Sequence, residues 1–144
     1  MKKIQENKQA IENLIQKDYK TLWNKSETSP FNIKDASNVY LESEKLTIID
    51  PDFKMMDKTA PTKVIDYAKV MPQLAAPWDM VAHGGITEIS NIQSDIYLNK
   101  AFVSFDAVGK MTFTNNESVD LQRNVTQFLE NTPKGWRIAY EHVS

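Results

Sequence analysis

The fold of this chain is decided by the stretch Gly135-Trp136-Arg137-Ile138-Ala139-Tyr140-Glu141-His142-Val143-Ser144. Side chains along a β-strand point alternately to the two faces of the sheet. One set here is large, Trp136, Ile138, Tyr140 and His142, and the other is smaller, Arg137, Ala139, Glu141 and Val143. We therefore predict a strand over residues 135–143 whose smaller set faces a crowded interior and whose larger set covers the outer face of a sheet.

The strands before this stretch are expected to follow one another directly. From residue 81 onward the hydrophobic pattern has a period of two. It predicts one long strand or two over 81–98, a tight turn at Asn99-Lys100, strands over 101–114 and 117–131, and a hairpin loop over 131–135. Short connections predict antiparallel pairing. Gly84, Gly85 and Gly109 are placed to allow the bends that a strongly curved sheet needs.

The first half of the chain has a mainly helical pattern. Apolar residues recur at helical spacing over 3–25, where Ile4, Ile11, Leu14, Ile15, Tyr19, Leu22 and Trp23 share one side. Shorter helices are predicted over 35–42, capped by Asp35, and over 61–72, with Pro61 in the first turn. The run 46–50 predicts a strand that stops at Pro51. Because helices precede the long strands, we predict an α+β fold: a single domain over 1–144 with a curved antiparallel sheet around N-terminal helices.

Composition excludes several classes of function. The 144 residues carry a net charge of −2 without a basic stripe, so no nucleic-acid partner is expected. The chain has no cysteine, which excludes disulfides, thiolate metal sites and a cysteine nucleophile. His83 and His142 lack the spacing of metal sites, and the four glycines cannot form a dinucleotide or phosphate loop. We expect no metal and no cofactor.

No membrane or export signal is apparent in the sequence. No apolar run approaches the roughly 20 residues that cross a bilayer. The basic start Met1-Lys2-Lys3 is followed by polar residues rather than by an apolar run. The expectation is a cytoplasmic protein without membrane contact, unless a signal peptide has been removed.

Three polar residues interrupt the face of the sheet that should look inward. Phe105 belongs to the apolar part of this face, whereas Arg123, Gln127 and Glu141 are polar. Buried charges need partners. Two interpretations stay open: an Arg123–Glu141 ion pair, or a role for these residues in binding a ligand.

The opposite face is expected to be rich in aromatic residues: Phe102, Phe128, Trp136 and Tyr140. An exposed patch of this kind usually marks an interface. We predict a homodimer formed through the outer face of the sheet.

The ending of the chain resembles that of the SnoaL-like branch of the nuclear transport factor two-like (ketosteroid isomerase-like) superfamily. The family pattern is Gly, Trp, an aliphatic residue, His-Glu-His and Ser. Glu141, His142 and Ser144 match it, and Tyr140 stands where the first His is common. Thr126 lies ten residues before Trp136 as in relatives, although Asn124 stands where relatives often have Arg. The pair Tyr40-Leu41 followed by the stretch 46–51 is similar to the second helix and first strand of the family.

This resemblance implies a cone of helices held in a curved antiparallel sheet, a cystatin-like α+β barrel. In such folds the mouth of the cone usually holds a pocket, and dimers through the sheet are common. The resemblance implies no particular reaction, because the superfamily includes isomerases, cyclases, dehydratases and non-catalytic association domains. Function has to be argued from the site.

The candidate catalytic residues are Asp50 and Glu141, because proton transfer on a small hydrophobic carbonyl compound needs an acid–base group with a shifted pKa in an apolar pocket. Tyr19, Trp23 and Tyr40 could donate hydrogen bonds to an oxyanion. We expect the ligand-binding residues to be Asp18, Tyr19, Trp23, Tyr40, Phe53, His83, Phe105, Arg123 and Gln127. Asp18 lies on the helical stripe, where it either reaches water at the edge or points into the cavity.

Three functions remain open at this point: a proton-transfer enzyme, a non-catalytic dimer that binds a small hydrophobic or carboxylate-bearing molecule, and a structural association module. A base needs a buried carboxylate or imidazole without a salt-bridge partner. A carboxylate binder needs a free arginine. An association module needs neither, so the contents of the pocket discriminate among the three.

Overall fold

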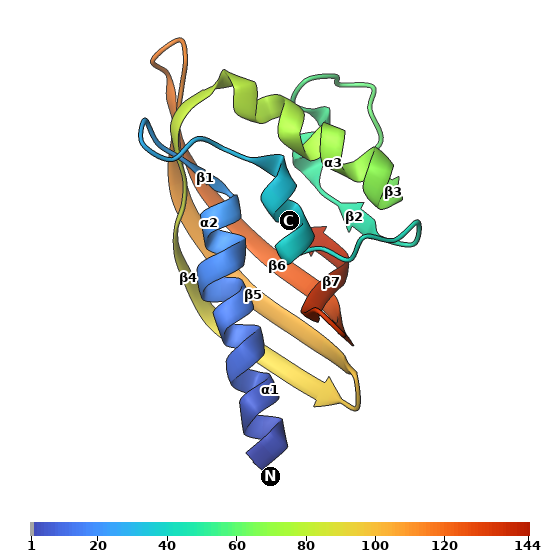
Figure 1. Ribbon diagram of the computed structural model, residues 1–144. Helices are drawn as coiled ribbons and strands as arrows, with labels where there is room; N and C mark the ends of the chain where they lie inside the picture. Colours follow the sequence, from blue (N-terminus) through green and yellow to red (C-terminus); the bar gives the residue numbers. More distant parts are fainter. Residues whose placement is uncertain (1) are drawn as a thin grey trace.

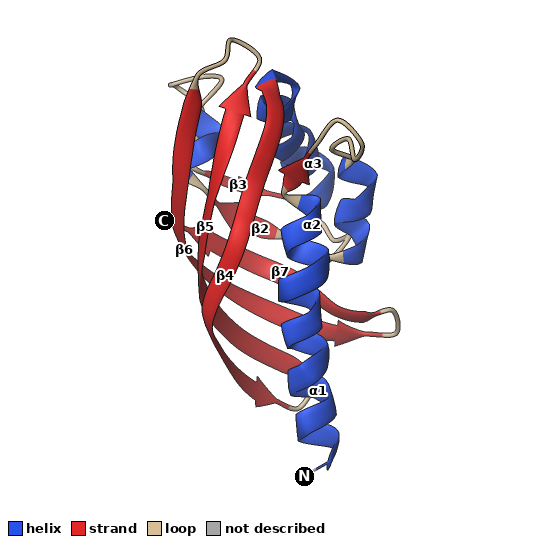
Figure 2. Cartoon of the chain, turned by 90° about the vertical axis from the view of Figure 1, so that its left-hand side faces the viewer, coloured by secondary structure: helices blue, strands red, loops and turns tan. Residues whose placement is uncertain are grey.

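A long curved sheet wraps around the N-terminal helix, as Figures 1 and 2 show from two directions. The structure is a computed structural model that describes residues 2–144. The helix is continuous through α1 (Lys2–Asn13), the π-helix η1 (Leu14–Tyr19) and α2 (Lys20–Leu22). The other helical elements are η2 (Ile33–Asn38), η3 (Pro51–Lys54), α3 (Tyr67–Ala75) and η4 (Ala76–Met80). The predicted α+β cone is confirmed.

Seven strands form one sheet in the order β1-β4-β5-β6-β7-β2-β3. The long strands are β4 (Val81–Tyr97), β5 (Lys100–Phe113), β6 (Ser118–Thr132) and β7 (Gly135–Val143), and each pairs antiparallel with the next, as predicted. The short strands are β1 (Asn24–Lys25), β2 (Thr47–Ile49) and β3 (Lys63–Ile65). β2 runs parallel to β7 and antiparallel to β3. The turn between β4 and β5 is formed by Leu98-Asn99, one residue earlier than predicted.

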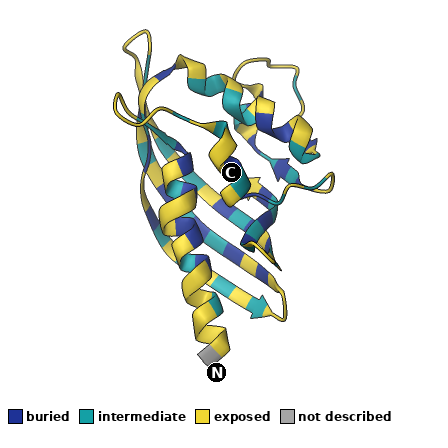
Figure 3. Cartoon of the chain, viewed as in Figure 1, coloured by how far each residue is buried: buried dark blue, intermediate teal, exposed yellow. Residues whose placement is uncertain are grey.

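The buried side of the N-terminal helix fills the concave face of the sheet. Ile11 and Ile15 are fully buried, and each contributes roughly 1.5–3 kcal/mol relative to an exposed position. Leu14, Tyr19, Leu22 and Trp23 are also buried, as the helical pattern predicts, whereas Ile4 is exposed. Figure 3 shows this division along the helix. The helix ends earlier than predicted because Asn24 and Lys25 pair with β4.

The predicted bend at Gly84-Gly85 is present and is where β1 joins the sheet. Asn24 pairs with Gly85 and Lys25 with Gly84. Both glycines have positive φ angles, 109° and 144°. β4 also has register shifts between Ile86 and Glu88 and between Ser90 and Gln93. Beside these bulges, the side chains of Gln16 and Asn24 donate to the backbone oxygens of Ile89 and Ile86, at 3.1 and 2.7 Å.

Two predicted helices differ from the observed ones. In place of a helix over 35–42, the chain forms the 3-10 helix η2 (Ile33–Asn38), and Asn32 caps it by accepting from the backbone N–H of Lys34. The predicted cap Asp35 lies inside this helix. In place of a helix over 61–72, residues 63–65 form β3, and α3 starts only after Asp66, whose side chain accepts from Ala68 N–H. Edge pairing with β2 prevails there over the helical pattern.

The last strand contains a bulge that the sequence pattern did not reveal. Phe128 pairs with Tyr140 and the next residue, Leu129, with Ile138, so Ala139 is the extra residue. The bulge reverses the alternation. Trp136 and Ile138 before it and Glu141 after it are all buried. The prediction that Trp136 and Ile138 lie on the outer face is therefore wrong, whereas Glu141 faces inward as predicted.

A side chain at Gly85 should destabilise the fold severely. A Cβ there would lie 2.1 Å from the backbone oxygen of Trp23, and φ is +144°. We expect Gly85→Ala to lower the free energy of unfolding by about 3 kcal/mol in urea titrations. The control is Gly135→Ala, where φ is also positive but the nearest atom is a flexible Arg137 nitrogen at 3.4 Å. It should cost about 1 kcal/mol, and equal losses for the two variants would contradict this account.

Candidate active site

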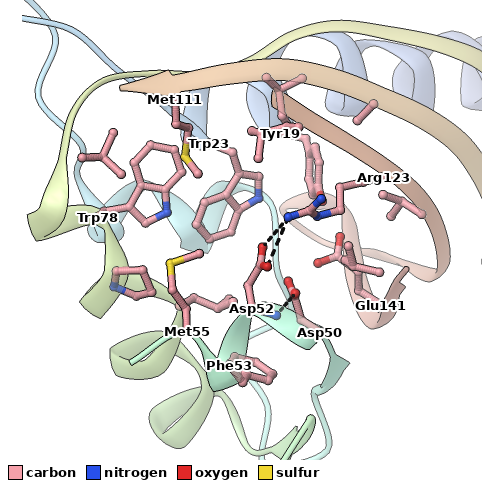
Figure 4. A pocket seen from close by; sticks show the side chains of 18 of the residues that line it. Tyr19, Trp23, Asp50, Asp52, Phe53, Met55, Trp78, Met111, Arg123 and Glu141 are labelled. Atoms are coloured by element: carbon pink, nitrogen blue, oxygen red, sulfur yellow. Dashed lines mark hydrogen bonds and ion pairs between the residues drawn. The ribbon is translucent and has the colours of Figure 1, made fainter. Parts of the chain in front are cut away.

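A cavity of about 110 Å³ opens at the wide end of the cone, between the sheet, the N-terminal helix and the segments η3, α3 and η4. Its volume is well above the roughly 10–15 Å³ that one water molecule requires. The walls are mainly apolar, and Trp23, Phe53, Met55, Trp78 and Met111 provide the largest side chains. The polar groups on the walls are Tyr19, Asp50, Asp52, Gln73, Arg123 and Glu141. Figure 4 shows this arrangement.

Asp50 is turned into the cavity by the way β2 ends. Pro51 stops the strand and starts η3, and Asp50 caps this short helix through a 2.8 Å hydrogen bond from the backbone N–H of Asp52 to its Oδ1. Only 9% of the residue is exposed. Burial raises the pKa of Asp50 from 3.8 to about 7, with further contributions from the charges of Asp52 and Glu141. The Asp52 N–H and Arg123 act in the opposite direction.

Arg123 pairs with Asp52, so of the two interpretations left open by the sequence the Arg123–Glu141 ion pair is wrong. One nitrogen, Nη2, lies 3.2 Å from each carboxylate oxygen of Asp52, while Nη1 donates to the backbone oxygen of Gln122. The strand register explains the change of partner. Gln127 lies opposite Glu141 and Val125 opposite Val143, so Arg123 extends beyond the end of β7 toward η3.

Glu141 lies in the interior, held by neutral donors. The Tyr40 hydroxyl donates to Oε2 and the Gln127 amide to Oε1, both at 2.8 Å, and Trp23 Nε1 donates to the Tyr40 oxygen at 3.3 Å. Burial raises the pKa of Glu141, while hydrogen bonds from Gln127, Tyr40 and Tyr19 lower it by a smaller amount. Burial and the nearby Glu141 raise the pKa values of Tyr19 and Tyr40 well above 10.0, so both hydroxyls keep their protons.

Trp23 and Trp78 form an aromatic wall at one end of the cavity, and Phe31 stacks against both rings. The rings of Phe31 and Trp78 stack at 4.8 Å with an interplanar angle of 7°, and Trp23 lies nearly parallel to both. The Lys25 ammonium group holds η4 at this end of the cavity by donating to the backbone oxygen of Trp78. Flat apolar rings of this kind suit a flat or ring-containing ligand.

The structure brings most of the predicted site residues together. Tyr19, Trp23, Asp50, Phe53, Arg123 and Glu141 line the cavity. Tyr40 and Gln127 lie behind Glu141, and the ring of Phe105 contacts that of Tyr19 at 5.5 Å. Asp18 and His83 are exposed and do not line the cavity, so their prediction as pocket residues is wrong. The π-helix η1 turns Asp18 to solvent and Tyr19 inward.

Two further contributors were missed by the sequence interpretation. Trp78 and Asp52 line the cavity but are not among the site residues that the sequence predicts. The signal for Asp52 is the spacing Asp50-Pro51-Asp52, because a proline at the start of a helical turn brings both carboxyl groups to one end of that turn.

Within residues 2–144, no group of three or more His, Asp or Glu side chains is arranged to hold a metal ion. The helices described in this range are all too short or too polar to span a bilayer.

Several solved structures have a similar fold. A protein from Kribbella flavida, Kfla4162, aligns with a TM-score of 0.76 at 13% identity, over 98% of this chain and 91% of its own. A nuclear transport factor 2-like superfamily protein from Salmonella enterica serovar Typhimurium aligns with a TM-score of 0.62 at 16% identity, over 78% and 76%. A hexachlorocyclohexane dehydrochlorinase (LinA) aligns with a TM-score of 0.68 at 11% identity, over 95% and 83%.

These likenesses show that the chain has the nuclear transport factor 2-like fold, as the resemblance in sequence implied. No protein-family model and no curated protein sequence matches the chain.

The raised pKa of Asp50 predicts a pH-dependent stability. Between about pH 4 and about pH 7 the unfolded chain has lost the Asp50 proton and the folded chain still holds it, so folding stability falls as pH rises through this window. Asp50→Asn removes this loss and keeps an oxygen for the Asp52 N–H. In urea titrations, we expect the free energy of unfolding of the variant to rise relative to that of the wild type by up to about 4 kcal/mol from the low-pH to the high-pH end of this window. Parallel stability curves for the two proteins would contradict the assignment.

Proposed function

We propose that this chain is a SnoaL-like protein that binds a small, neutral, hydrophobic carbonyl compound in the cavity and moves a proton on it, with Asp50 as the general base. One observation carries the proposal: the carboxyl group of Asp50 lies buried on the wall of an apolar cavity. It has no ion-pair partner among the described residues, and its pKa is raised to about 7. A base with a pKa near the working pH is the group that such chemistry requires.

The second carboxyl group of the cavity suits a supporting role. Both Glu141 oxygens accept hydrogen bonds, from Tyr40 and from Gln127, and the residue is 2% exposed. By contrast, one Asp50 oxygen accepts only the N–H of Asp52. We therefore assign proton transfer to Asp50 and assign to Glu141 the placement of Tyr40, from which it accepts a hydrogen bond.

The alternative is a non-catalytic dimer that binds a ligand or serves as an association module. A ligand that enters with a full negative charge needs a cation that is not already neutralised, and Asp52 neutralises the charge of Arg123. The ionisable carboxyl groups around it also disfavour an anion. One structural neighbour is named as a dehydrochlorinase, a name that denotes removal of hydrogen chloride and is compatible with acid–base chemistry in this fold. These points favour the enzyme.

The proposed activity predicts carbon–hydrogen exchange on a ketone. We expect the protein to accelerate deuterium uptake next to the carbonyl group of α-tetralone in heavy water, measured by NMR. The rate should rise with pH through about pH 7, because Asp50 acts as a base only when ionised. Asp50→Asn should lower the protein-dependent rate by about 100-fold or more.

The control is Asp18→Asn, which changes an exposed aspartate outside the cavity and should leave the rate unchanged. Exchange that is equally fast in Asp50→Asn and wild type would refute Asp50 as the base. If no aryl ketone from a screen exchanges faster with protein than without it, the binding-module alternative becomes the better account.

We also propose that the chain forms a homodimer through the outer face of the sheet. Phe102, Phe128 and Tyr140 form a row across β5, β6 and β7, with ring centroids 5.1 and 5.7 Å apart. Phe102 and Phe128 remain 40% and 50% exposed. A continuous row of exposed aromatic rings is typical of an interface.

Sedimentation equilibrium tests the dimer. Phe128→Glu places a charge at the centre of the aromatic row and should weaken self-association by about 10-fold or more. Ile4→Glu, an equivalent change at an exposed residue of α1, should leave it unaltered. A wild-type protein that remains monomeric at high concentration would exclude this interface.

A further inference from the structure

The proposed proton transfer creates negative charge on the substrate oxygen, and the cavity must supply donors for it. Trp23, Tyr19 and Tyr40 are the donors that the sequence suggests. The structure directs two of them elsewhere: Trp23 donates to Tyr40, and Tyr40 donates to Glu141. Tyr19 lies on the cavity wall and is a neutral donor. A donor committed to a buried carboxyl group is costly to withdraw from it. Trp23 and Tyr40 therefore do not meet the need, and of the three only Tyr19, a neutral hydroxyl, remains available.

Arg123 is the cationic side chain on the cavity wall. Its side chain is 27% exposed, and Figure 4 shows the guanidinium pointing into the cavity toward Asp52. Nη2 donates to both oxygens of Asp52 and Nη1 to the backbone of Gln122. Among the described residues, Nε has no hydrogen-bond acceptor. A guanidinium has five N–H donors, so the group can donate to a ligand oxygen without leaving Asp52.

We propose that Arg123 is a further catalytic residue, which stabilises the charge that forms on the substrate oxygen, and that Asp52 is the residue that positions it. The inference rests on the proposed function, since it concerns the same proton transfer in the same cavity. It adds a requirement on the substrate: the oxygen that becomes charged must reach Arg123 while the acidic carbon reaches Asp50. The substrate class is thus a neutral ketone or related carbonyl compound with an apolar body.

The step conserves atoms and charge. The bond between the acidic carbon and its hydrogen breaks, and the proton moves to an Asp50 oxygen. The electron pair of that bond forms a carbon–carbon double bond, and the carbonyl π pair moves to the oxygen. The resulting enolate oxygen lies against the guanidinium of Arg123. Return of the proton from Asp50 to carbon completes an isomerisation or an exchange, so no oxidant or further reactant is required.

Asp52 contacts both the proposed base, Asp50, and the proposed oxyanion donor, Arg123. It fixes the guanidinium through two 3.2 Å contacts, and its backbone N–H holds the carboxyl group of Asp50 at 2.8 Å. The charged groups that act on the pKa of Asp50 are Asp52 from η3, Glu141 from β7 and Arg123 from β6. The charge of Asp50 in turn raises the pKa of Tyr19 in the helix. The charge of Asp52 raises the pKa of Asp50 and that of Arg123 lowers it, so removal of either should move the pH profile, in opposite directions.

The exchange of α-tetralone in heavy water tests the roles of both residues. Arg123→Met should lower the rate on the high-pH plateau by about 100- to 1000-fold, the usual effect of losing one oxyanion donor. Arg123→Lys should restore part of this loss, because it keeps a cation. Asp52→Asn should move the rise of the rate with pH to lower pH, and Arg123→Met should move it to higher pH. Lys110→Met, which removes an exposed cation of β5, should change neither rate nor profile.

A second measurement does not depend on turnover. α-Naphthol has the shape of the enol of α-tetralone, and its ionisation is followed by ultraviolet absorbance. Bound to the wild type, it should ionise at lower pH than in water, and in Arg123→Met this shift should disappear. In Asp50→Asn the shift should persist although exchange is lost.

The outcomes separate the two proposals. A plateau rate in Arg123→Met within about twofold of wild type, or a bound naphthol that ionises at the same pH in both proteins, overturns the role of Arg123. Loss of the naphthol shift in Arg123→Met supports that role even where the ketone does not exchange, and the absence of exchange then counts against the proposed function alone.

Discussion

The hydrogen-bonded burial of the Glu141 carboxyl group is the constraint on which the rest of the structure depends. It joins β7 to β6 through Gln127, to the segment after η2 through Tyr40, and through Tyr40 to Trp23 at the end of the N-terminal helix. A carboxyl group without these donors would be very costly at 2% exposure. The need to satisfy it therefore holds the sheet and the helical layer in one fixed relation, and the cavity lies between them.

From that fixed relation follows the electrostatic division of the cavity. One end holds the aromatic wall of Trp23 and Trp78, and the other holds Asp50 and Glu141. The ion pair of Arg123 and Asp52 belongs to the polar part and carries no net charge. A carboxyl group buried beside neutral groups and a compensated ion pair keeps its proton to higher pH than one in water. The apolar walls and the altered acidity are thus two results of the same packing.

The sequence predicted the order of elements, the antiparallel pairing of the long strands and most of the residues on the inner face, because each of these follows from local periodicity. It failed where distant parts of the chain decide. The extra residue at Ala139 lies in a strand with a regular pattern, and only its pairing with β6 reveals it. Residues 63–65 have a helical pattern but pair with β2. The partner of Arg123 depends on where β7 ends relative to η3, which the local sequence does not encode.

The irregularity of β4 also affects how the protein behaves in a concentrated solution. Only Gly84 and Gly85 of this strand pair with β1, so most of its far side is a sheet edge, the kind of surface on which chains add to one another and aggregate. Here the bulges interrupt the row of backbone groups, and Gln16 and Asn24 occupy two of its carbonyl oxygens. An incoming strand would find neither a straight template nor a full set of acceptors. The bulges that curve β4 around the cavity thus also make its free edge a poor template for the addition of further strands.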